Sequence, residues 1–331
     1  MNLSGLFGSY PGMYVTQSFF HLVIAAIIVD TTIRVWDIRN PRVTQRFRFL
    51  AIIFPIFSFP AYQLINPGRG SIFFRQEALF DSNRWMHLEL WGKVPVGLFF
   101  LFMFFFTAII FLVQELVPVV RHTLESRGQE LDEEAFCDNS AVISALADLP
   151  VEKPEVFVLE DDEEHVVFST TGRKAAVFLS SGLVKTLSPE QLQAAVAHEI
   201  AHIERSKRPM LFVVFLLRIL MFFNPLVLLE FRRATQDEEK ICDDMAVSLT
   251  KKPHVLAETL KQLYRTSEGG DPPQIRQFSN LKDSLEEYSH NIHMESRIRR
   301  LEDGHLKQRH GEWLKFALTS MTIIAINYFV V

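Results

Sequence analysis

The chain has 331 residues and a formal net charge of −5, and 48% of its residues are hydrophobic, including 30 phenylalanines. The acidic balance offers no electrostatic footprint for nucleic acid, so we expect no nucleic-acid partner. This high apolar content and the long uncharged runs are typical of a membrane protein rather than of a soluble enzyme with a large core. Two cysteines, Cys137 and Cys242, do not make a disulfide framework. The first residues carry no basic region, so we expect no cleaved signal peptide.

The N-terminal part contains three apolar stretches that are long enough to cross a bilayer. They are Tyr14–Ile33, Phe49–Ile65 and Val94–Val113. Asp30 lies near the end of the first stretch, where an interfacial position or a functional polar site would each explain it. Arginines gather after the first stretch and none precede it, which predicts an outside N-terminus and a cytoplasmic chain from Gln114 onward. Residues 1–120 are therefore expected to form an N-terminal membrane domain with three spans.

Short runs with the period of β-strands follow the polar linker after the third stretch. They are Glu155–Leu159, Val166–Ser169 and Ala176–Leu179. They predict a small sheet beside the helix that comes next in the chain. The edge strand of such a sheet could hold an extended peptide by strand addition, and a purely structural hairpin explains the same pattern.

The next segment, Leu187–Arg208, is predicted to be a helix that carries a metal-binding motif. Ser188 suits the N-cap, Pro189 the first helical position and Gln191 a capping box. Residues 198–202 read His-Glu-Ile-Ala-His, so His198 and His202 leave one face and both rings can reach one ion. Glu199 points to one side of the pair, where it could take a proton from water rather than bind the metal. Two surface histidines are the alternative, but the small apolar residues around the motif predict a buried face, whose polar groups need partners.

The segment at residues 210–229 is apolar and long enough for one crossing, yet it contains Arg218 and Asn224-Pro225. The acidic helix predicted after it, Glu230–Leu249, is the candidate source of a third metal ligand. That ligand has to lie on the same side of the membrane as the two histidines. We therefore expect the segment to be re-entrant or interfacial, with a break at Asn224-Pro225.

Within the acidic helix, Glu239 and Asp243 are four residues apart and share a face. One can coordinate zinc while the other orients a histidine ligand, and we favour Glu239 as the ligand. Glu238 and Asp244 point elsewhere and are expected to be solvated. Cys242 could bind metal in principle, but a small buried thiol is the better interpretation. An exposed acidic helix without a metal is the alternative for the whole segment.

The remaining chain is predicted to be mostly polar and helical up to residue 301. The break at residues 269–273, Gly-Gly-Asp-Pro-Pro, is a candidate lid or substrate loop. A short apolar segment at residues 311–331 closes the chain, and we expect it to be a C-terminal membrane segment. Residues 121–310 are then the catalytic domain.

Together these motifs resemble the membrane-bound gluzincin metallopeptidases. The similarity covers the HtpX-type heat-shock proteases, the CaaX prenyl proteases of the Ste family and the BlaR/MecR antibiotic-sensing peptidases. It rests on Leu179-Ser180-Ser181-Gly182-Leu183, Leu187-Ser188-Pro189-Glu190-Gln191-Leu192 and Ala197-His198-Glu199-Ile200-Ala201-His202. Phe222-Phe223-Asn224-Pro225-Leu226 and Glu239-Lys240-Ile241-Cys242-Asp243 are most similar to the BlaR/MecR branch. His293 with Arg297-Ile298 and Leu301 resembles an HtpX and prenyl-protease element, with Met294 in place of its proline.

The resemblance implies a role for each matching residue. His198, His202 and Glu239 would bind Zn²⁺, Glu199 would be the general base, and Asp243 would orient a ligand. His293 is a candidate for stabilising the oxyanion, and Arg297 for a structural or substrate-positioning role.

We therefore expect an α+β, mainly α fold, with polytopic membrane helices, a small β-sheet and a zincin-type helical catalytic domain. The expected function is a zinc metalloendopeptidase, multi-pass in the inner or plasma membrane, whose catalytic domain faces the cytoplasm. It would hydrolyse peptide bonds of membrane or membrane-proximal proteins, with the lipid bilayer as its other partner and the oligomeric state left open. One alternative is a signalling or scaffold protein whose zinc site is structural and which acts through partner binding. A transporter or channel component is a third hypothesis, motivated by His21, Asp30 and Arg218.

Overall fold

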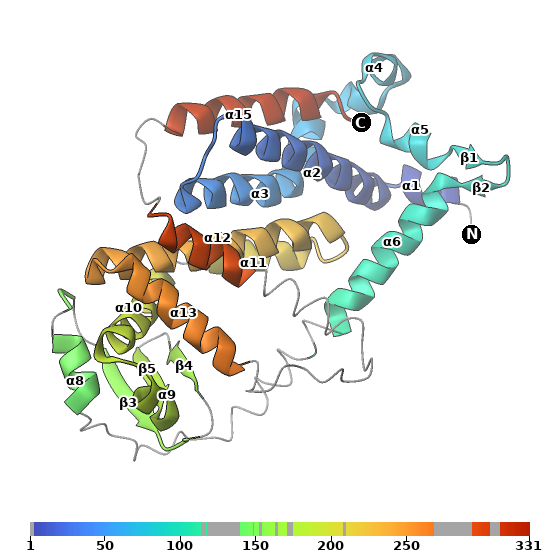
Figure 1. The fold of residues 1–331 in the computed structure, drawn as a ribbon. Coiled ribbons are helices and arrows are strands. Elements are labelled where there is room, and N and C mark those ends of the chain that lie inside the picture. Colours follow the sequence, from blue (N-terminus) through green and yellow to red (C-terminus); the bar gives the residue numbers. More distant parts are fainter. Residues whose placement is uncertain are drawn as a thin grey trace. The chain divides into compact units, whose positions relative to one another are not determined.

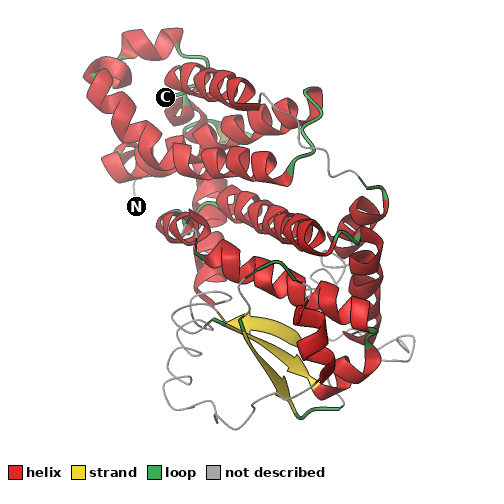
Figure 2. Ribbon diagram, turned by 90° about the vertical axis from the view of Figure 1, so that its left-hand side faces the viewer, coloured by secondary structure: helices red, strands yellow, loops and turns green. Residues whose placement is uncertain are grey.

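The computed structural model describes residues 3–113, 117, 140–147, 149–151, 154–162, 165–170, 175–207, 210–267, 293–304 and 312–331. The chain forms two compact units. Unit 1 comprises Met1–Glu130, Met210–Asp237 and Gln308–Val331, and unit 2 comprises Leu131–Pro209 and Glu238–Lys307. The described residues are mainly helical with small sheets, which confirms the predicted fold class (Figure 2). The candidate lid at residues 269–273 lies outside the described residues.

The described residues of unit 1 are mainly helical and include a two-stranded ribbon (Figure 1). Its helices are α1 (Leu3–Gly8), α2 (Tyr10–Val35), α3 (Pro41–Ile65), α4 (Ile72–Glu77), α5 (Ser82–Met86), α6 (Val96–Phe111), α11 (Met210–Leu220), the first half of α12 (Pro225–Thr250) and α15 (Glu312–Tyr328). The ribbon pairs β1 (Glu89–Leu90) with β2 (Val94–Pro95), and the 3-10 helix η1 spans Pro67–Gly70. Among the described residues, α2 and α3 are long and apolar enough to cross a membrane, and α6 is a shorter apolar helix.

The apolar segment at 210–229 is not one continuous helix. Helix α11 ends at Leu220, the chain turns, and α12 begins at Pro225. The Asn224 side chain accepts a hydrogen bond from the backbone N–H of Leu226 at 3.1 Å, so it caps the new helix. Because Pro225 supplies no N–H, its place at the first helical position costs α12 no hydrogen bond.

Charged residues in the helices of unit 1 form a closed ring of four side chains. Arg48 on α3 lies 2.7 Å from the Asp30 carboxylate and 2.8 Å from the Glu230 carboxylate. Arg233 lies 3.0 Å from Asp30 and 2.9 Å from Glu230. Each carboxylate thus has two guanidinium partners, and the ring is neutral as a whole. This arrangement explains how Asp30 and Glu230 are accommodated among apolar helices.

The other two polar residues of the apolar stretches also have partners within unit 1. His21 is fully buried, with Nδ1 2.6 Å from the Ser58 hydroxyl and Nε2 3.2 Å from the Val330 carbonyl oxygen. The Arg218 guanidinium lies 4.7 Å from the centre of the Phe231 ring. Packing within the unit therefore accounts for both side chains.

Unit 2 is built on a three-stranded sheet with the order β3-β5-β4 (Figure 1). The central strand β5 (Ala176–Ser180) pairs in parallel with β3 (Glu155–Leu159) and antiparallel with β4 (Val167–Thr170). The helices are α8 (Ser140–Ala147), α9 (Ser181–Thr186), α10 (Pro189–Ser206), the second half of α12, α13 (Pro253–Ser267) and an unlabelled helix at residues 293–302. The buried side chains of α10 and β5 share one hydrophobic core with those of α8 and α13. Helix α10 is thereby fixed at the centre of the unit.

Candidate metal centre

Helix α10 begins where the sequence predicts. The Ser188 hydroxyl accepts a hydrogen bond from the Gln191 N–H at 3.3 Å, and the Gln191 side chain accepts one from the Ser188 N–H at 3.0 Å. This capping box satisfies two N–H groups that would otherwise lack partners, and it fixes the start of the helix. His198 and Glu199 lie ten and eleven residues along the chain from Ser188 and are buried.

Three side chains converge at one point in unit 2. The Nε2 atoms of His198 and His202 lie 3.1 Å apart. The two carboxylate oxygens of Glu239 lie 3.7 Å from these nitrogens, Oε2 from His198 and Oε1 from His202. One donor atom from each residue falls within 4.8 Å of the other two. Ligand atoms about 2.0–2.1 Å from a tetrahedral zinc ion lie roughly 3.3–3.4 Å from one another, so the three residues fit such an ion.

The chemistry of this donor set also suits a cation. Two imidazoles cannot both hold a proton on nitrogens that face each other this closely, and burial together with the charge of His198 lowers the pKa of His202. Burial acts to lower the pKa of His198 as well, but the carboxylates of Asp243 and Glu239 beside the ring outweigh it and raise that pKa to about 9. Against the effect of burial, His198 and the Arg297 charge lower the pKa of Glu239 to about 2. Glu239 is therefore an anion that faces two nitrogen donors.

A buried carboxylate supports His198 from behind. Asp243 is fully buried, and its Oδ1 lies 3.2 Å from His198 Nδ1. Arg297, on the helix at 293–302, donates to Asp243 through Nε at 2.8 Å and through Nη2 at 2.7 Å. Its Nη1 also lies 3.1 Å from Glu239 Oε2. Burial alone would raise the pKa of Asp243, but the Arg297 charge and hydrogen bonds overcome it and lower that pKa.

Cys242 supports the second histidine, which the sequence interpretation did not foresee. Its Sγ lies 3.5 Å from Nδ1 of His202. The other ring nitrogen of His202, Nε2, is the one that faces Glu239. The thiol is fully buried, and burial raises its pKa, so it stays protonated at neutral pH. Glu239, Cys242 and Asp243 thus occupy one turn of α12, facing the metal position and the two histidines. The sequence signal was the spacing of three and four residues from Glu239.

Two acidic residues that the sequence predicted to be solvated, Glu238 and Asp244, each form an ion pair with an arginine, and Glu238 is buried. Glu238 is buried and forms a two-pronged ion pair with Arg205, both contacts being 2.5 Å. Asp244 lies 2.6 Å from Arg300. Both arginines are far from these acids along the chain, so spacing within α12 could not reveal the pairs. The acidic helix is therefore covered on several sides by arginines.

The two residues with predicted catalytic roles lie close enough to the ligands to influence them electrostatically. Glu199 is buried and interacts with His202. His293 interacts with Glu239 and Asp243, and its Nε2 is buried with no hydrogen-bond partner among the described residues. Burial and the Arg297 charge lower the pKa of His293 to about 4, so this ring is neutral at physiological pH.

Comparison with known proteins gives two kinds of similarity. The family model described as "BlaR1 peptidase M56" matches residues 90–269, which include His198, Glu199, His202, Glu239 and Asp243. A "Protease HtpX homolog" of Chlorobium luteolum is 30% identical over 121 residues, 34% of this chain and 40% of that protein. A "Protease HtpX homolog 2" of Methanosarcina mazei is 33% identical over 84 residues, 24% of this chain and 27% of that protein. The chain thus spans less than half the length of these curated relatives.

The matched region contains the apolar helix α6, the sheet, and the helices α10 and α12 that bring the histidines and Glu239 together. His293 and Arg297 lie beyond its end. The predicted resemblance to membrane metallopeptidases of the BlaR and HtpX type is confirmed. The chain belongs to the BlaR1 peptidase M56 family of membrane metallopeptidases.

Proposed function

We propose that this protein is a zinc-dependent endopeptidase that cleaves membrane or membrane-proximal proteins. The observation that carries the proposal is the convergence of His198, His202 and Glu239 next to a buried Glu199. Two histidines and one carboxylate leave a fourth zinc position for water or substrate, which is the arrangement of catalytic rather than structural zinc sites.

The chain's own residues supply the remaining steps. Zinc, when bound by His198, His202 and Glu239, supplies a Lewis acid that activates water and polarises the scissile carbonyl. Glu199 accepts the proton of the attacking water and delivers it to the leaving amine. His293 is neutral, so one ring nitrogen carries a proton that it can donate to the oxyanion that develops on the substrate. Asp243 favours the tautomer of His198 that leaves Nε2 free, and the Cys242 sulfur can accept a hydrogen bond from Nδ1–H of His202 when Nε2 of that ring binds the metal.

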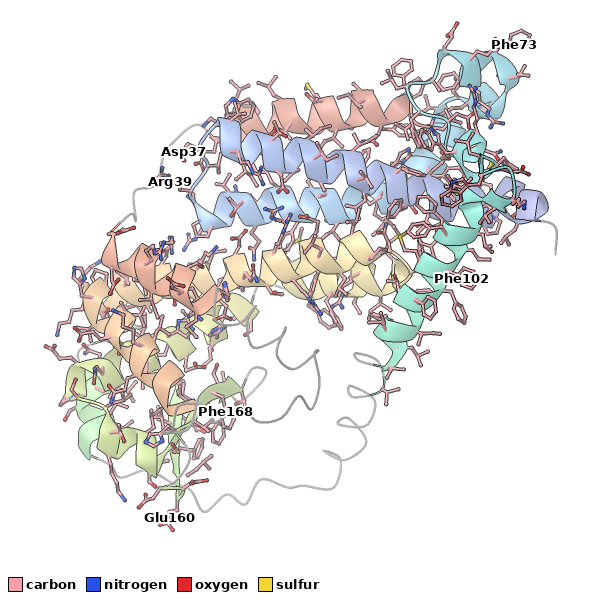
Figure 3. The ribbon with its side chains drawn as sticks, turned by 45° about the vertical axis from the view of Figure 1, so that its right-hand side comes forward. Asp37, Arg39, Phe73, Phe102, Glu160 and Phe168 are labelled. Carbon is pink, nitrogen blue, oxygen red and sulfur yellow. The ribbon has the colours of Figure 1, made fainter. Side chains whose placement is uncertain are left out.

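The sheet offers a place for an extended substrate. In the described part of unit 2, β4 is an edge strand, because it pairs only with β5 on one side. It is also packed against α10, the helix that carries the histidines. Phe168 lies at the centre of this strand and is 42% exposed (Figure 3). A peptide added to β4 would gain main-chain hydrogen bonds and bury this ring.

The membrane context follows from the family and from helices α2 and α3. We propose a multi-pass arrangement with unit 2 on the cytoplasmic side, since five arginines cluster from the end of α2 to the first half of α3, at residues 34–48. Substrates would then be proteins at or in the inner face of the membrane.

The decisive experiment replaces Glu199 with Gln in the full-length protein. Cleavage of casein and of a detergent-solubilised membrane protein should be lost, while zinc content, measured by atomic emission, should stay at the wild-type level. Glu204→Gln is the matched control, because Glu204 is exposed on the same helix and pairs only with Lys207 among the described residues. Retained cleavage by Glu199→Gln would refute the assignment. Zinc binding without any cleavage by the wild type would favour the scaffold alternative.

A further inference from the structure

A cavity of about 1060 Å³ lies in unit 1, in the segment that connects α3 with α6. Its volume is close to the upper end of the range of small-molecule sites, which is about 1,000 Å³. The walls come from α4, α5 and the residues around them, and they include none of the metal-centre residues. The lining includes Arg75, Leu79, Phe80, Asp81, Arg84 and Trp85.

The polar part of the wall favours an anion. Arg75 is held by Asp81 through two hydrogen bonds, of 2.9 and 2.8 Å, and Asp81 also caps α5 by accepting from the Arg84 N–H at 3.0 Å. Arg84 is exposed, and its guanidinium has no ion pair within the described segments. The cavity therefore presents two guanidinium groups and a single carboxylate, which is already engaged. A phosphate matches the planar fork of a free guanidinium.

The rest of the wall is apolar. Phe80 and Trp85 stack at 5.6 Å between ring centres, and Leu79 is 69% exposed. Close by in sequence, Phe73 on α4 is 78% exposed (Figure 3). Trp91, in the β1–β2 turn, is 89% exposed. A group of large exposed apolar side chains usually marks a surface that contacts a membrane, another protein or a ligand. The apolar helices α3 and α6 flank this segment in the chain. We therefore expect the bilayer interface to cover these side chains.

We propose that this cavity binds the phosphate headgroup of an anionic membrane phospholipid. Arg84 contacts the phosphate, Arg75 lies beside it, and Leu79 and Trp85 pack along the glycerol and the first part of an acyl chain. The site thereby anchors the α4–α5 segment to one leaflet. It is independent of the metal centre and of the proposed peptidase activity.

The test uses the full-length protein, purified in detergent and depleted of lipid. Binding of phosphatidylglycerol, phosphatidylcholine and inorganic phosphate is measured by native mass spectrometry and by titration. The wild type should bind phosphatidylglycerol more tightly than either other probe. Arg84→Gln should weaken phosphatidylglycerol binding by about tenfold or more, because a charge-assisted hydrogen bond is lost. Arg39→Gln is the matched control, since Arg39 is an exposed arginine of the same unit outside the cavity.

A second variant separates the headgroup from the chain. Leu79→Ser should weaken phosphatidylglycerol binding and leave inorganic phosphate binding unchanged, because it removes only apolar contact. The Leu79 side chain is mostly exposed, so the Leu79→Ser change should not disturb folding. Arg84→Lys, which keeps the positive charge, should retain part of the affinity for phosphatidylglycerol. The proposal is overturned if Arg84→Gln binds phosphatidylglycerol like the wild type or if Arg39→Gln loses as much affinity. It is also overturned if inorganic phosphate binds as tightly as the lipid, which would make the cavity a free-anion site.

Discussion

Asp243 Oδ1 lies 3.2 Å from Nδ1 of His198, at the end of the ring opposite the proposed metal position. A carboxylate in this place makes Nδ1 the protonated nitrogen and leaves the lone pair of Nε2 for the metal.

Replacing Asp243 with Asn should weaken zinc binding by about 10–100-fold, since the partner that orients His198 and raises its basicity is lost. Competition with a chromogenic chelator measures the affinity. Asp244→Asn is the control on the same helix, because the Asp244 carboxylate pairs with Arg300. Equal zinc affinity of Asp243→Asn and the wild type would contradict the role given to Asp243.

Cys242 should act as a hydrogen-bond partner of His202 and not as a ligand. Cys242→Ala should lower zinc affinity several-fold, and Cys242→Ser, which keeps a polar atom in place, should lower it less. The cobalt-substituted wild type should show no thiolate-to-cobalt charge-transfer band in its absorption spectrum. Such a band, or unchanged zinc affinity in the alanine variant, would rule this role out.

Removing Arg297 should destabilise unit 2. Arg297→Gln leaves the buried Asp243 without its counter-charge, which costs on the order of 3–5 kcal/mol in the free energy of unfolding. The melting temperature of the full-length protein in detergent reports the change. Arg299→Gln is the control, because Arg299 is exposed and forms a surface pair with Glu295. A melting temperature within a degree of the wild type for Arg297→Gln would show that the pair does not stabilise the fold.

The ring of Asp30, Arg48, Glu230 and Arg233 gives a prediction about paired changes. Arg48→Gln leaves the ring with an excess negative charge among apolar helices, so the melting temperature should fall. The double variant Arg48→Gln with Asp30→Asn restores neutrality and leaves Glu230 paired with Arg233, so it should be more stable than the single variant. Arg46→Gln, exposed on the same helix, controls for the loss of a positive charge. Additive losses in the double variant would show that the ring does not act as one unit.

Local signals predicted much of the candidate site. Ser188, Pro189 and Gln191 set the start of α10, so the positions of His198 and His202 on one face followed from helical spacing. The requirement that Glu239 return to these histidines predicted a break in the apolar segment, and α11 ends before Asn224-Pro225. The first inference depended on residues within a few turns of one another, and the second on the need of a single metal ion for three ligands on one side of the membrane.

Helical spacing and strand patterns could not predict ion pairs or strand pairs between residues far apart in the sequence. Arg233 reaches Asp30 across 203 positions of sequence, and many arginines could have taken its place. The parallel pairing of β3 with β5 also left no mark in the strand patterns, because alternation is the same in parallel and antiparallel strands. For the same reason the sequence suggested solvent around Glu238, which Arg205 covers. The sequence shows that a buried charged side chain needs an ion-pair partner, but only the folded structure shows which residue is that partner.

The two-pronged pair of Arg297 and Asp243 joins residues that are 54 positions apart in the chain. During synthesis the histidines, Glu239 and Asp243 leave the ribosome well before Arg297 does. Until then the acidic turn of α12 lacks the cation that neutralises it, and the centre cannot settle into its final geometry. The proposed metal centre thus depends on a residue from a later part of the chain, and its geometry is complete only when the helix at 293–302 has packed against α12.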